Sequence, residues 1–300
     1  MTKITLLDGG MGQELIRRAS GPPTPLWSAQ VMMDEPDLVR DVHLDNIRAG
    51  ARVITLNTYS VTRTRLEPHG LAEQFKVLQR RAIDLAQAAR DASGEEVAIA
   101  GCLPPYLWSY RPEMNPGAAE MIPHYNEIAS LQAPHVDLLL CETMGSAEEA
   151  FAAVSAAAAT GKPVWVSWTL ADDGTGRLRS GETLAEANAA LDGLPVAARL
   201  VNCSKPETVD LAFDDLKALG GTVGAYANGF TGIRDYFTAG STVAGLSARA
   251  DLGPEQYADF AMGWVDRGAK IIGGCCEVGP EHIAELARRL AEAGHEIVGA

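Results

Sequence analysis

Short apolar segments rich in β-branched residues alternate with longer helical patterns along the whole chain of 300 residues. Eight of these segments have the length and composition of strands, and a helical pattern follows each of them. Several of the apolar runs show little polar alternation, which is typical of parallel strands that are buried on both faces. The expected strands are residues 4–8, 52–58, 97–103, 136–142, 164–170, 198–203, 222–228 and 270–276.

The helical patterns carry recognisable start and stop residues. Pro206, Pro254 and Pro280 each stand where the first turn of a helix tolerates proline. Four patterns are followed by a glycine, where a helix commonly ends in a left-handed residue; these are Gly50, Gly161, Gly220 and Gly268. The expected helices are residues 37–49, 72–92, 118–131, 147–159, 184–191, 206–219, 254–267 and 280–293.

Eight strands, each followed by a helix, predict a (β/α)8 TIM barrel of the α/β class. A doubly wound open sheet is the alternative, but it usually has only about five to seven strands. Because no linker, charge block or repeat divides the chain, we expect residues 1–300 to form a single domain. Residues 20–33, 104–117 and 229–253 exceed the usual length of a βα loop, which predicts elaborated loops on the C-terminal face, where barrel enzymes have their active sites.

Charge and cysteine content exclude several classes of protein. The chain has 39 acidic and 25 basic residues, a formal net charge of -14, which argues against a nucleic-acid or anionic-membrane partner. It has no apolar run of about 18 residues that could span a bilayer. Five cysteines, an odd number, without a secretory signal favour reduced thiols. We therefore expect a cytoplasmic protein, with a homo-oligomer as one open arrangement.

Reactive side chains gather where the predicted strands end. Asp8 ends the first strand, and Glu142 ends the fourth, directly after Cys141. The other four cysteines stand at the ends of the third, sixth and eighth strands; they are Cys102, Cys203, Cys275 and Cys276. Because the carboxyl ends of parallel strands meet at one end of a barrel, we expect these groups to share one site.

Cys203, Cys275 and Cys276 are the candidate metal ligands. Three thiolates with an open fourth position suit Zn²⁺ in a catalytic role. Neighbouring strand residues point to opposite faces, so a Cys-Cys pair can reach one ion only where the strand is ending, and the preceding Gly273-Gly274 permits this. The alternative is that these cysteines are small buried hydrophobes. A histidine-based metallohydrolase lacks ligands, because all six histidines lie away from the predicted strand ends.

Asp8 and the glycines after it form a candidate site for an amino acid. The Asp8 carboxylate can hold an ammonium group, while the amides of Gly9 and Gly10 can hold a carboxylate. A simple tight turn is an equally good interpretation of these residues alone. Glu142 is costly to bury without a cation, which a bound ammonium or a neighbouring Arg or Lys would supply.

The order of these elements resembles the homocysteine S-methyltransferase family, which shares its barrel with betaine–homocysteine methyltransferases and with the homocysteine module of cobalamin-dependent methionine synthase. The resemblance covers essentially the whole chain. The segments that carry it are Asp8-Gly9-Gly10-Met11-Gly12, Asn57-Thr58-Tyr59, Glu142-Thr143, Asn202-Cys203-Ser204, Gly273-Gly274-Cys275-Cys276 and Pro280-Glu281-His282-Ile283.

The resemblance implies a zinc-dependent S-methyltransferase that forms methionine. It implies that the three cysteines bind zinc, that Asp8 and Glu142 hold the homocysteine ammonium, and that Tyr59 lies beside zinc and substrate. It also implies that the amides around Gly9 and Gly10 hold the homocysteine carboxylate. The donor would be a sulfonium compound, S-methylmethionine or S-adenosylmethionine, because the chain has no cobalamin or folate module.

Several residues are candidates for the donor side of the site. Aromatic rings near the C-terminal face can stack on the donor cation: Trp108, Tyr110, Trp168, Tyr226 and Phe230. Trp168 is favoured because it lies near the end of the strand at 164–170. Asn228, at the end of the strand at 222–228, is a further candidate for substrate binding.

Departures from the family pattern leave the donor open. Glu277-Val278-Gly279 follows the Cys-Cys pair where the family often has Gly-Thr-Thr, and Gln13 stands where many members have Thr. The alternatives are methyl transfer to another thiol or a selenol such as selenocysteine, or transfer from a betaine-type donor. A non-enzymatic zinc or redox protein would leave Asp8 and Glu142 without a role.

Overall fold

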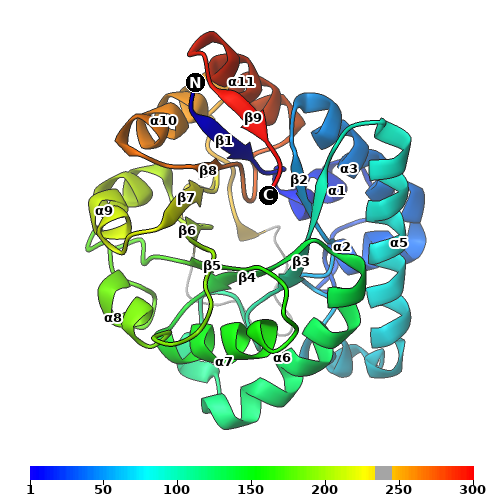
Figure 1. Ribbon diagram of the computed structural model, residues 1–300. Helices are drawn as coiled ribbons and strands as arrows, with labels where there is room; N and C mark the ends of the chain where they lie inside the picture. The colour runs from blue at the N-terminus through cyan, green and yellow to red at the C-terminus, as the bar shows by residue number, and fades with distance from the viewer. Residues whose placement is uncertain (234–244) are drawn as a thin grey trace.

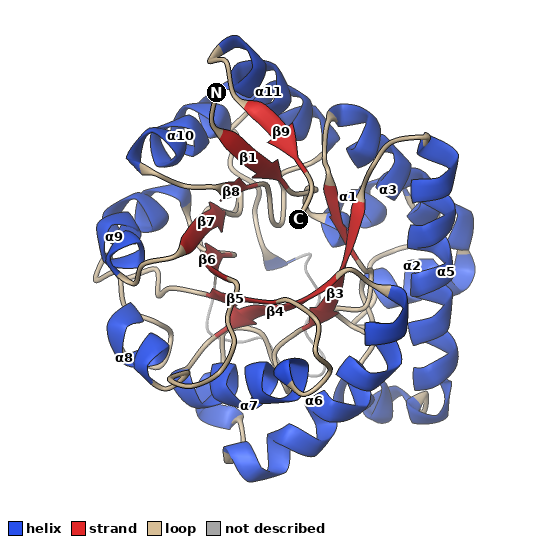
Figure 2. Cartoon of the chain, in the orientation of Figure 1, coloured by secondary structure: helices blue, strands red, loops and turns tan. Residues whose placement is uncertain are grey.

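The computed structural model describes residues 1–233 and 245–300, and it forms a parallel barrel surrounded by helices (Figures 1 and 2). Part of the expected long loop at 229–253 lies outside the described residues. The strands are β1 (Lys3–Leu6), β2 (Val53–Thr55), β3 (Ala98–Leu103), β4 (Leu138–Met144), β5 (Val164–Trp168), β6 (Ala198–Asn202), β7 (Thr222–Tyr226), β8 (Ile271–Ile272) and β9 (Glu296–Val298).

Neighbouring strands run parallel in the order β2 to β8, and then β1 and β9 follow. The barrel closes where Leu7, just after β1, pairs with Val53 of β2. Arg52 N donates to Leu6 O at 2.9 Å, and Asp8 N donates to Val53 O at 3.0 Å. The predicted α/β barrel is therefore confirmed. β9 is a further strand that was not predicted; its three residues pair with Lys3–Thr5 beside the amino-terminal part of β1.

The expected helices are present, with ends that differ by at most three residues from the predictions. They are α3 (Pro36–Ala49), α5 (Phe75–Ser93), α6 (Ala118–Gln132), α7 (Ala147–Ala158), α8 (Leu184–Ala189), α9 (Pro206–Ala218), α10 (Pro254–Arg267) and α11 (Pro280–Glu292). The three prolines begin α9, α10 and α11 as predicted. The glycines expected past the helix ends have positive φ, for example 118° at Gly50 and 77° at Gly220.

Three short helices were not predicted: α1 (Met11–Arg18), α2 (Ser28–Asp34) and α4 (Arg63–Leu66). The segment 20–33, expected as a loop, therefore contains most of α2. Tertiary contacts support this short helix, because Ala29 N donates to Ser60 Oγ at 3.1 Å and Ser28 Oγ lies 3.2 Å from the same oxygen. A helix of seven residues is too short to show a clear apolar period in the sequence.

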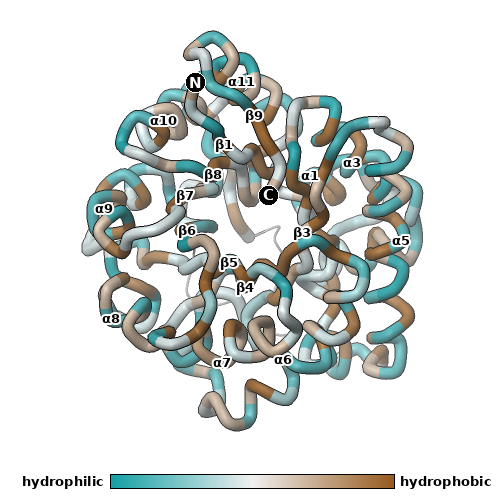
Figure 3. The backbone as a smooth tube through the Cα atoms, viewed as in Figure 1, coloured by the Kyte–Doolittle hydropathy of each residue, from teal (hydrophilic) through white to brown (hydrophobic). Residues whose placement is uncertain are grey.

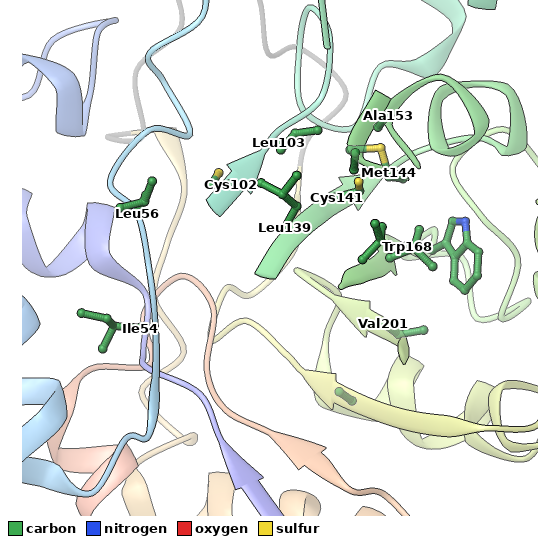
Figure 4. Packing of buried hydrophobic residues seen from close by; sticks show 14 of the residues in the cluster. Ile54, Leu56, Cys102, Leu103, Leu139, Cys141, Met144, Ala153, Trp168 and Val201 are labelled. Carbon is green, nitrogen blue, oxygen red and sulfur yellow. The ribbon is translucent and has the colours of Figure 1, made fainter. Parts of the chain in front are cut away.

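Two apolar layers follow from the alternation of side chains along the strands. Leu138 and Leu140 of β4 belong to the cluster inside the barrel, whereas Leu139 and Cys141 pack outside it against the helices (Figure 4). Helices such as α5 alternate between hydrophilic and hydrophobic segments along their length, as expected for elements with one face toward a sheet (Figure 3). None of the helices within residues 1–233 and 245–300 is long and apolar enough to cross a membrane.

Candidate active site

A cavity lies at the carboxyl ends of the strands, and its wall contains most of the residues that the sequence analysis selected. They come from the segments after β1, β2, β6 and β8 and from the end of β4. Trp168 and Asn228 are selected residues that do not line it. The selected residues that do are Asp8, Gly9, Gly10, Tyr59, Glu142, Cys203, Cys275 and Cys276.

The three candidate ligand cysteines converge in this cavity. Cys203 Sγ lies 2.9 Å from Cys275 Sγ and 4.0 Å from Cys276 Sγ. All three sulfur atoms lie within 4.8 Å of one another. Three thiols from two separate segments therefore aim at one point, and an all-sulfur donor set is one that zinc accepts. The residues present fit a zinc ion with a further ligand position open toward the cavity.

Mutual contacts shift the acidity of the three thiols in opposite directions. Hydrogen bonds from Cys275 and Cys276 lower the pKa of Cys203 well below its usual value. The same contacts with Cys203 raise the pKa of Cys275 and of Cys276. Tyr110 places its hydroxyl oxygen 2.9 Å from Cys203 Sγ. The cluster thus concentrates negative charge on Cys203, where a cation would be stabilised.

The glycine turn after β1 packs directly against the turn that carries the cysteine pair. A Cβ atom on Gly10 would lie 2.2 Å from Cys275 O, and one on Gly9 would lie 2.2 Å from Val278 O. Only glycine allows the two backbones to approach this closely. The turn after β1 therefore sets the position of the cysteine pair as well as that of Asp8.

The amides of this turn are not free for a substrate carboxylate, contrary to the sequence-based expectation. Gly9 N donates to Asn46 Oδ1 at 3.0 Å, and Gly10 N donates to Val278 O at 2.8 Å. The following residues, Met11 and Gly12, also line the cavity and form the first turn of α1. Amides in the first turn of a helix have no carbonyl partner within the helix.

Asp8 and Glu142 are buried carboxyl groups that face the same cavity. Thr55 donates to Asp8 through its amide at 2.8 Å and through its hydroxyl at 3.3 Å. Glu142 accepts from Cys102 Sγ at 2.9 Å and from the Tyr226 hydroxyl at 3.5 Å. Burial is the main cause that raises the pKa of each carboxyl group to about 7, and the charge of Glu142 adds to the effect on Asp8.

Neither carboxyl group forms an ion pair with Lys, Arg or His within the described part of the chain. Two buried acids without a cationic partner are costly to ionise. A ligand ammonium between them would lower that cost. The alternative prediction, that a neighbouring Arg or Lys forms an ion pair with Glu142, is therefore not met among the described residues.

A reciprocal pair of hydrogen bonds holds the strand ends that carry Glu142 and Cys203. Thr143 N donates to Asn202 Oδ1 at 2.9 Å, and Asn202 Nδ2 donates to Thr143 Oγ1 at 2.8 Å. Thr143 and Cys203 both have positive φ, 61° and 49°. A bulge interrupts the β4–β5 pairing between Cys141 and Met144. The two hydrogen bonds thus hold Thr143 and Cys203 in unfavourable backbone conformations. These conformations direct the side chains of Glu142 and Cys203 toward the cavity.

Four of the five aromatic candidates line the cavity, but the favoured one does not. Trp108, Tyr110, Tyr226 and Phe230 are in its wall. Trp168 is fully buried in the outer apolar layer (Figure 4). On β5 the residue that faces the barrel interior is Trp165, and a side chain three positions later points to the opposite face. Trp168 therefore cannot stack on a ligand in this cavity.

Asn228 lies outside the cavity, whereas Tyr59 forms part of its wall. Asn228 is fully buried outside the cavity, and its Oδ1 accepts from Phe230 N at 3.1 Å, which shapes the turn after β7. The Tyr59 hydroxyl lies 2.8 Å from Ser109 Oγ, and the tyrosine hydroxyl in contact with a thiol of the cluster is that of Tyr110. Tyr59 remains in the cavity wall, edge-on to Trp27 with ring centroids 5.8 Å apart.

Arg65 and Trp27 line the cavity and were missed by the sequence analysis. Arg65 lies in α4, soon after the end of β2, and Trp27 directly precedes α2. The only feature of the sequence that could have indicated them is that both follow a strand and therefore lie on the C-terminal face of the barrel. Neither short helix was predicted, so nothing indicated which of their residues turn inward.

Comparisons with known proteins agree with this geometry. A family model described as homocysteine S-methyltransferase matches residues 5–290. The homocysteine S-methyltransferase of Escherichia coli K12 is 32% identical over 292 residues, which covers 91% of each chain. The selenocysteine methyltransferase of Astragalus bisulcatus is 25% identical over 310 residues, which covers 91% of this chain and 88% of the relative. The metallated form of the homocysteine methyltransferase MmuM from Escherichia coli superimposes with a TM-score of 0.80 at 30% identity, covering 95% of this chain and 96% of the other.

Proposed function

The chain belongs to the homocysteine S-methyltransferase family, and from this premise we propose that it transfers a methyl group from a sulfonium donor to homocysteine, which forms methionine. One observation carries the proposal. A thiol cluster suited to a soft metal ion shares one cavity with two buried carboxyl groups that have no cationic partner among the described residues. We treat residues 1–300 as one domain and place the enzyme in the cytoplasm, where its five free cysteines stay reduced.

We propose Zn²⁺ as the cofactor, held by Cys203, Cys275 and Cys276. The spacing of their sulfur atoms and the low pKa of Cys203 support this assignment. When bound, zinc supplies a Lewis acid that lowers the pKa of a thiol at its open position. The Tyr110 hydroxyl lies 2.9 Å from Cys203 Sγ, and its hydrogen bond helps to lower the pKa of this thiol.

The remaining groups orient the acceptor. Asp8 and Glu142 bind the homocysteine ammonium inside the cavity. The amides of Met11 and Gly12, in the first turn of α1, bind its carboxylate. The deprotonated sulfur attacks the donor methyl carbon, a new S–C bond forms, and the old bond breaks with its electron pair on the donor sulfur. Because the donor loses its positive charge, an apolar cavity wall with rings such as Trp108 and Phe230 favours the reaction.

There is one alternative to homocysteine as the acceptor and one alternative to a sulfonium compound as the donor. A selenol such as that of selenocysteine would use the same cavity, and one relative is named a selenocysteine methyltransferase. A betaine-type donor is the alternative on the donor side. Competition between homocysteine and selenocysteine, with each donor in turn, separates these activities.

The test measures zinc content together with methionine formation from S-methylmethionine, S-adenosylmethionine or betaine. We expect about one zinc per chain and turnover with a sulfonium donor. Cys275→Ser should lose zinc and activity while it keeps the circular dichroism spectrum of the fold. Cys141→Ala is the matched control, because Cys141 is buried outside the cavity. A Cys275→Ser protein with one zinc and full activity would refute the ligand assignment.

A further inference from the structure

Among the described residues, Arg65 is a cation in the cavity wall that has no anionic partner. It extends from α4, and within the described residues no carboxylate forms an ion pair with its guanidinium. Its Nη2 donates to Ser109 Oγ at 3.2 Å, and its Nε is buried without a hydrogen-bond partner among the residues described. Two residues earlier in the same helix, Arg63 forms a two-point ion pair with Glu127, with distances of 2.7 and 2.8 Å.

The guanidinium of Arg65 is held in place by aromatic rings. Its Cζ lies 5.3 Å from the centroid of the Tyr59 ring and 5.8 Å from that of Trp108. Tyr59 and Ser109 are themselves joined by a 2.8 Å hydrogen bond, so the rings and the hydroxyl form one support. A cation held in this way has lost part of its hydration, and burial lowers the pKa of Arg65.

An anionic ligand is the expected partner of such a group. A buried charge without a partner is costly, and a planar guanidinium matches a carboxylate through two parallel hydrogen bonds. The nearby buried acid Glu149 acts on Arg65 only through space, because no ion pair joins the two groups and the Glu149 oxygens accept from Gly145 N, Tyr106 N and Asn115 Nδ2 at 2.9, 3.0 and 2.6 Å.

Position separates this subsite from the one for the acceptor. The groups assigned to homocysteine follow β1 and end β4, whereas Arg65, Tyr59 and Trp108 belong to the segments after β2 and β3. The segment after β3 also reaches the thiol cluster, because Tyr110, next to Ser109, contacts Cys203. A molecule bound to Arg65 therefore lies against the segment that also contacts the thiol cluster at Cys203.

We propose that Arg65 binds the carboxylate of the methyl donor, so that the enzyme selects sulfonium compounds that carry a carboxylate. This inference rests on the proposed function for the identity of the ligand as a donor. It assigns the specificity of the donor side to Arg65, whereas Arg63 in the same helix is paired with Glu127 and does not line the cavity.

The experiment compares S-methylmethionine with its carboxamide, which keeps the sulfonium and the ammonium but has no carboxylate. Both are tested on the zinc-loaded full chain and on Arg65→Met and Arg65→Lys, with Arg63→Met as the matched control. Steady-state kinetics are measured for donor and acceptor, and binding of each donor is measured by calorimetric titration without homocysteine, so that no methyl transfer contributes heat.

We expect Arg65→Met to raise the KM and Kd for S-methylmethionine by about 10- to 100-fold, the range for loss of a charged hydrogen bond. The values for the carboxamide and for homocysteine should stay within about twofold, with Arg65→Lys intermediate and Arg63→Met unchanged. Equal losses with both donors, or a loss confined to homocysteine, would overturn the assignment. If wild type binds S-methylmethionine through Arg65 but transfers no methyl group, the proposed function fails and the carboxylate subsite stands.

Discussion

At the scale of single residues, the site depends on two carboxyl groups whose burial is unfavourable for the folded protein. Asp8 and Glu142 each have a pKa of about 7 because burial disfavours their ionised forms. Each is held by neutral donors: Thr55 for Asp8, and Cys102 and Tyr226 for Glu142. A cation in the cavity would favour the ionised forms of both groups, which is the basis of the ammonium site that we propose here.

The charge state of this pair predicts the pH dependence of homocysteine binding. Both carboxyl groups become neutral as the pH falls through about 7, so kcat/KM for homocysteine should decline on the acid side of this value. Glu142→Gln should raise the KM for homocysteine by about 10- to 100-fold. It should also shift the acid limb to lower pH, because the charge of Glu142 no longer raises the pKa of Asp8. Glu148→Gln, on the exposed face of α7, is the control. A pH profile that Glu142→Gln leaves unchanged contradicts the assignment.

The same substitution should stabilise the protein without ligands. The folded-state pKa of Glu142 is raised, so its ionisation costs stability as the pH rises from 4.5 through about 7. At pH 8, Glu142→Gln should increase the free energy of unfolding by up to about 3 kcal/mol, since one pKa unit corresponds to about 1.4 kcal/mol. The gain should vanish at about pH 4, where wild type is already neutral. Urea unfolding at both pH values measures it, and a loss of stability at pH 8 would show that the substituted amide cannot satisfy the neighbouring donors.

At the scale of elements, the candidate active site depends on a contact between the turn after β1 and the turn after β8. The glycines after β1 pack against the backbone of the segment after β8, and no side chain separates them. A second link joins β4 and β6 through Thr143 and Asn202. Contacts between strand ends therefore position the candidate ligand cysteines and the carboxyl groups, through the backbone at the glycine turn and through side chains between β4 and β6.

Gly10→Ala tests the first of these contacts. The new Cβ would lie 2.2 Å from Cys275 O, so the cysteine turn must move. We expect a loss of more than about 2 kcal/mol in unfolding free energy, together with weaker zinc retention. Gly21→Ala is the matched control, because a Cβ there meets no atom within 4 Å. Denaturant titration and metal analysis check both variants, and normal stability and zinc content in Gly10→Ala would contradict this role of the glycine turn.

At the scale of the whole molecule, the barrel closes incompletely at its amino-terminal end. β1 and β2 pair only at Leu7 and Val53, and β9 occupies the remaining edge of β1. Glu296 N donates to Thr2 O at 3.0 Å, and Thr5 Oγ1 donates to Gly299 O at 3.0 Å. The carboxyl-terminal strand therefore contributes to stability at the end of the barrel opposite the cavity.

Removal of residues 296–300 should separate stability from catalysis. The truncation exposes the edge of β1 and removes a short strand, so we expect the Tm to fall by about 3 to 6 °C. The KM values and kcat should be unchanged at room temperature, because the cavity lies at the other end. Deletion of Ala300 alone is the control. Calorimetry and kinetics decide the matter, and a selective loss of activity without a change in Tm would show that β9 acts on the active site.

The barrel, the positions of most helices and the gathering of reactive residues at one end of the barrel can all be predicted from the order of the amino acids. These follow from local periodicity and from the rule that parallel strands end together, so they need no knowledge of contacts. This reasoning predicts Asp8, Glu142 and the three cysteines as one site and suggests an ammonium group and a zinc ion there, and the family resemblance adds homocysteine as the molecule bound.

Only the folded structure shows which of those groups face the cavity and have no hydrogen-bond or ion-pair partner within the described part of the protein. Contacts from distant segments occupy the amides of Gly9 and Gly10, and strand alternation turns Trp168 away from the cavity. Among the described residues, Arg65 lacks the anionic partner that Arg63 has. The partners of the glycine amides and of Arg63 come from segments far apart in the chain that meet only after folding, and the face of Trp168 depends on which alternate residues of β5 the closed barrel turns inward.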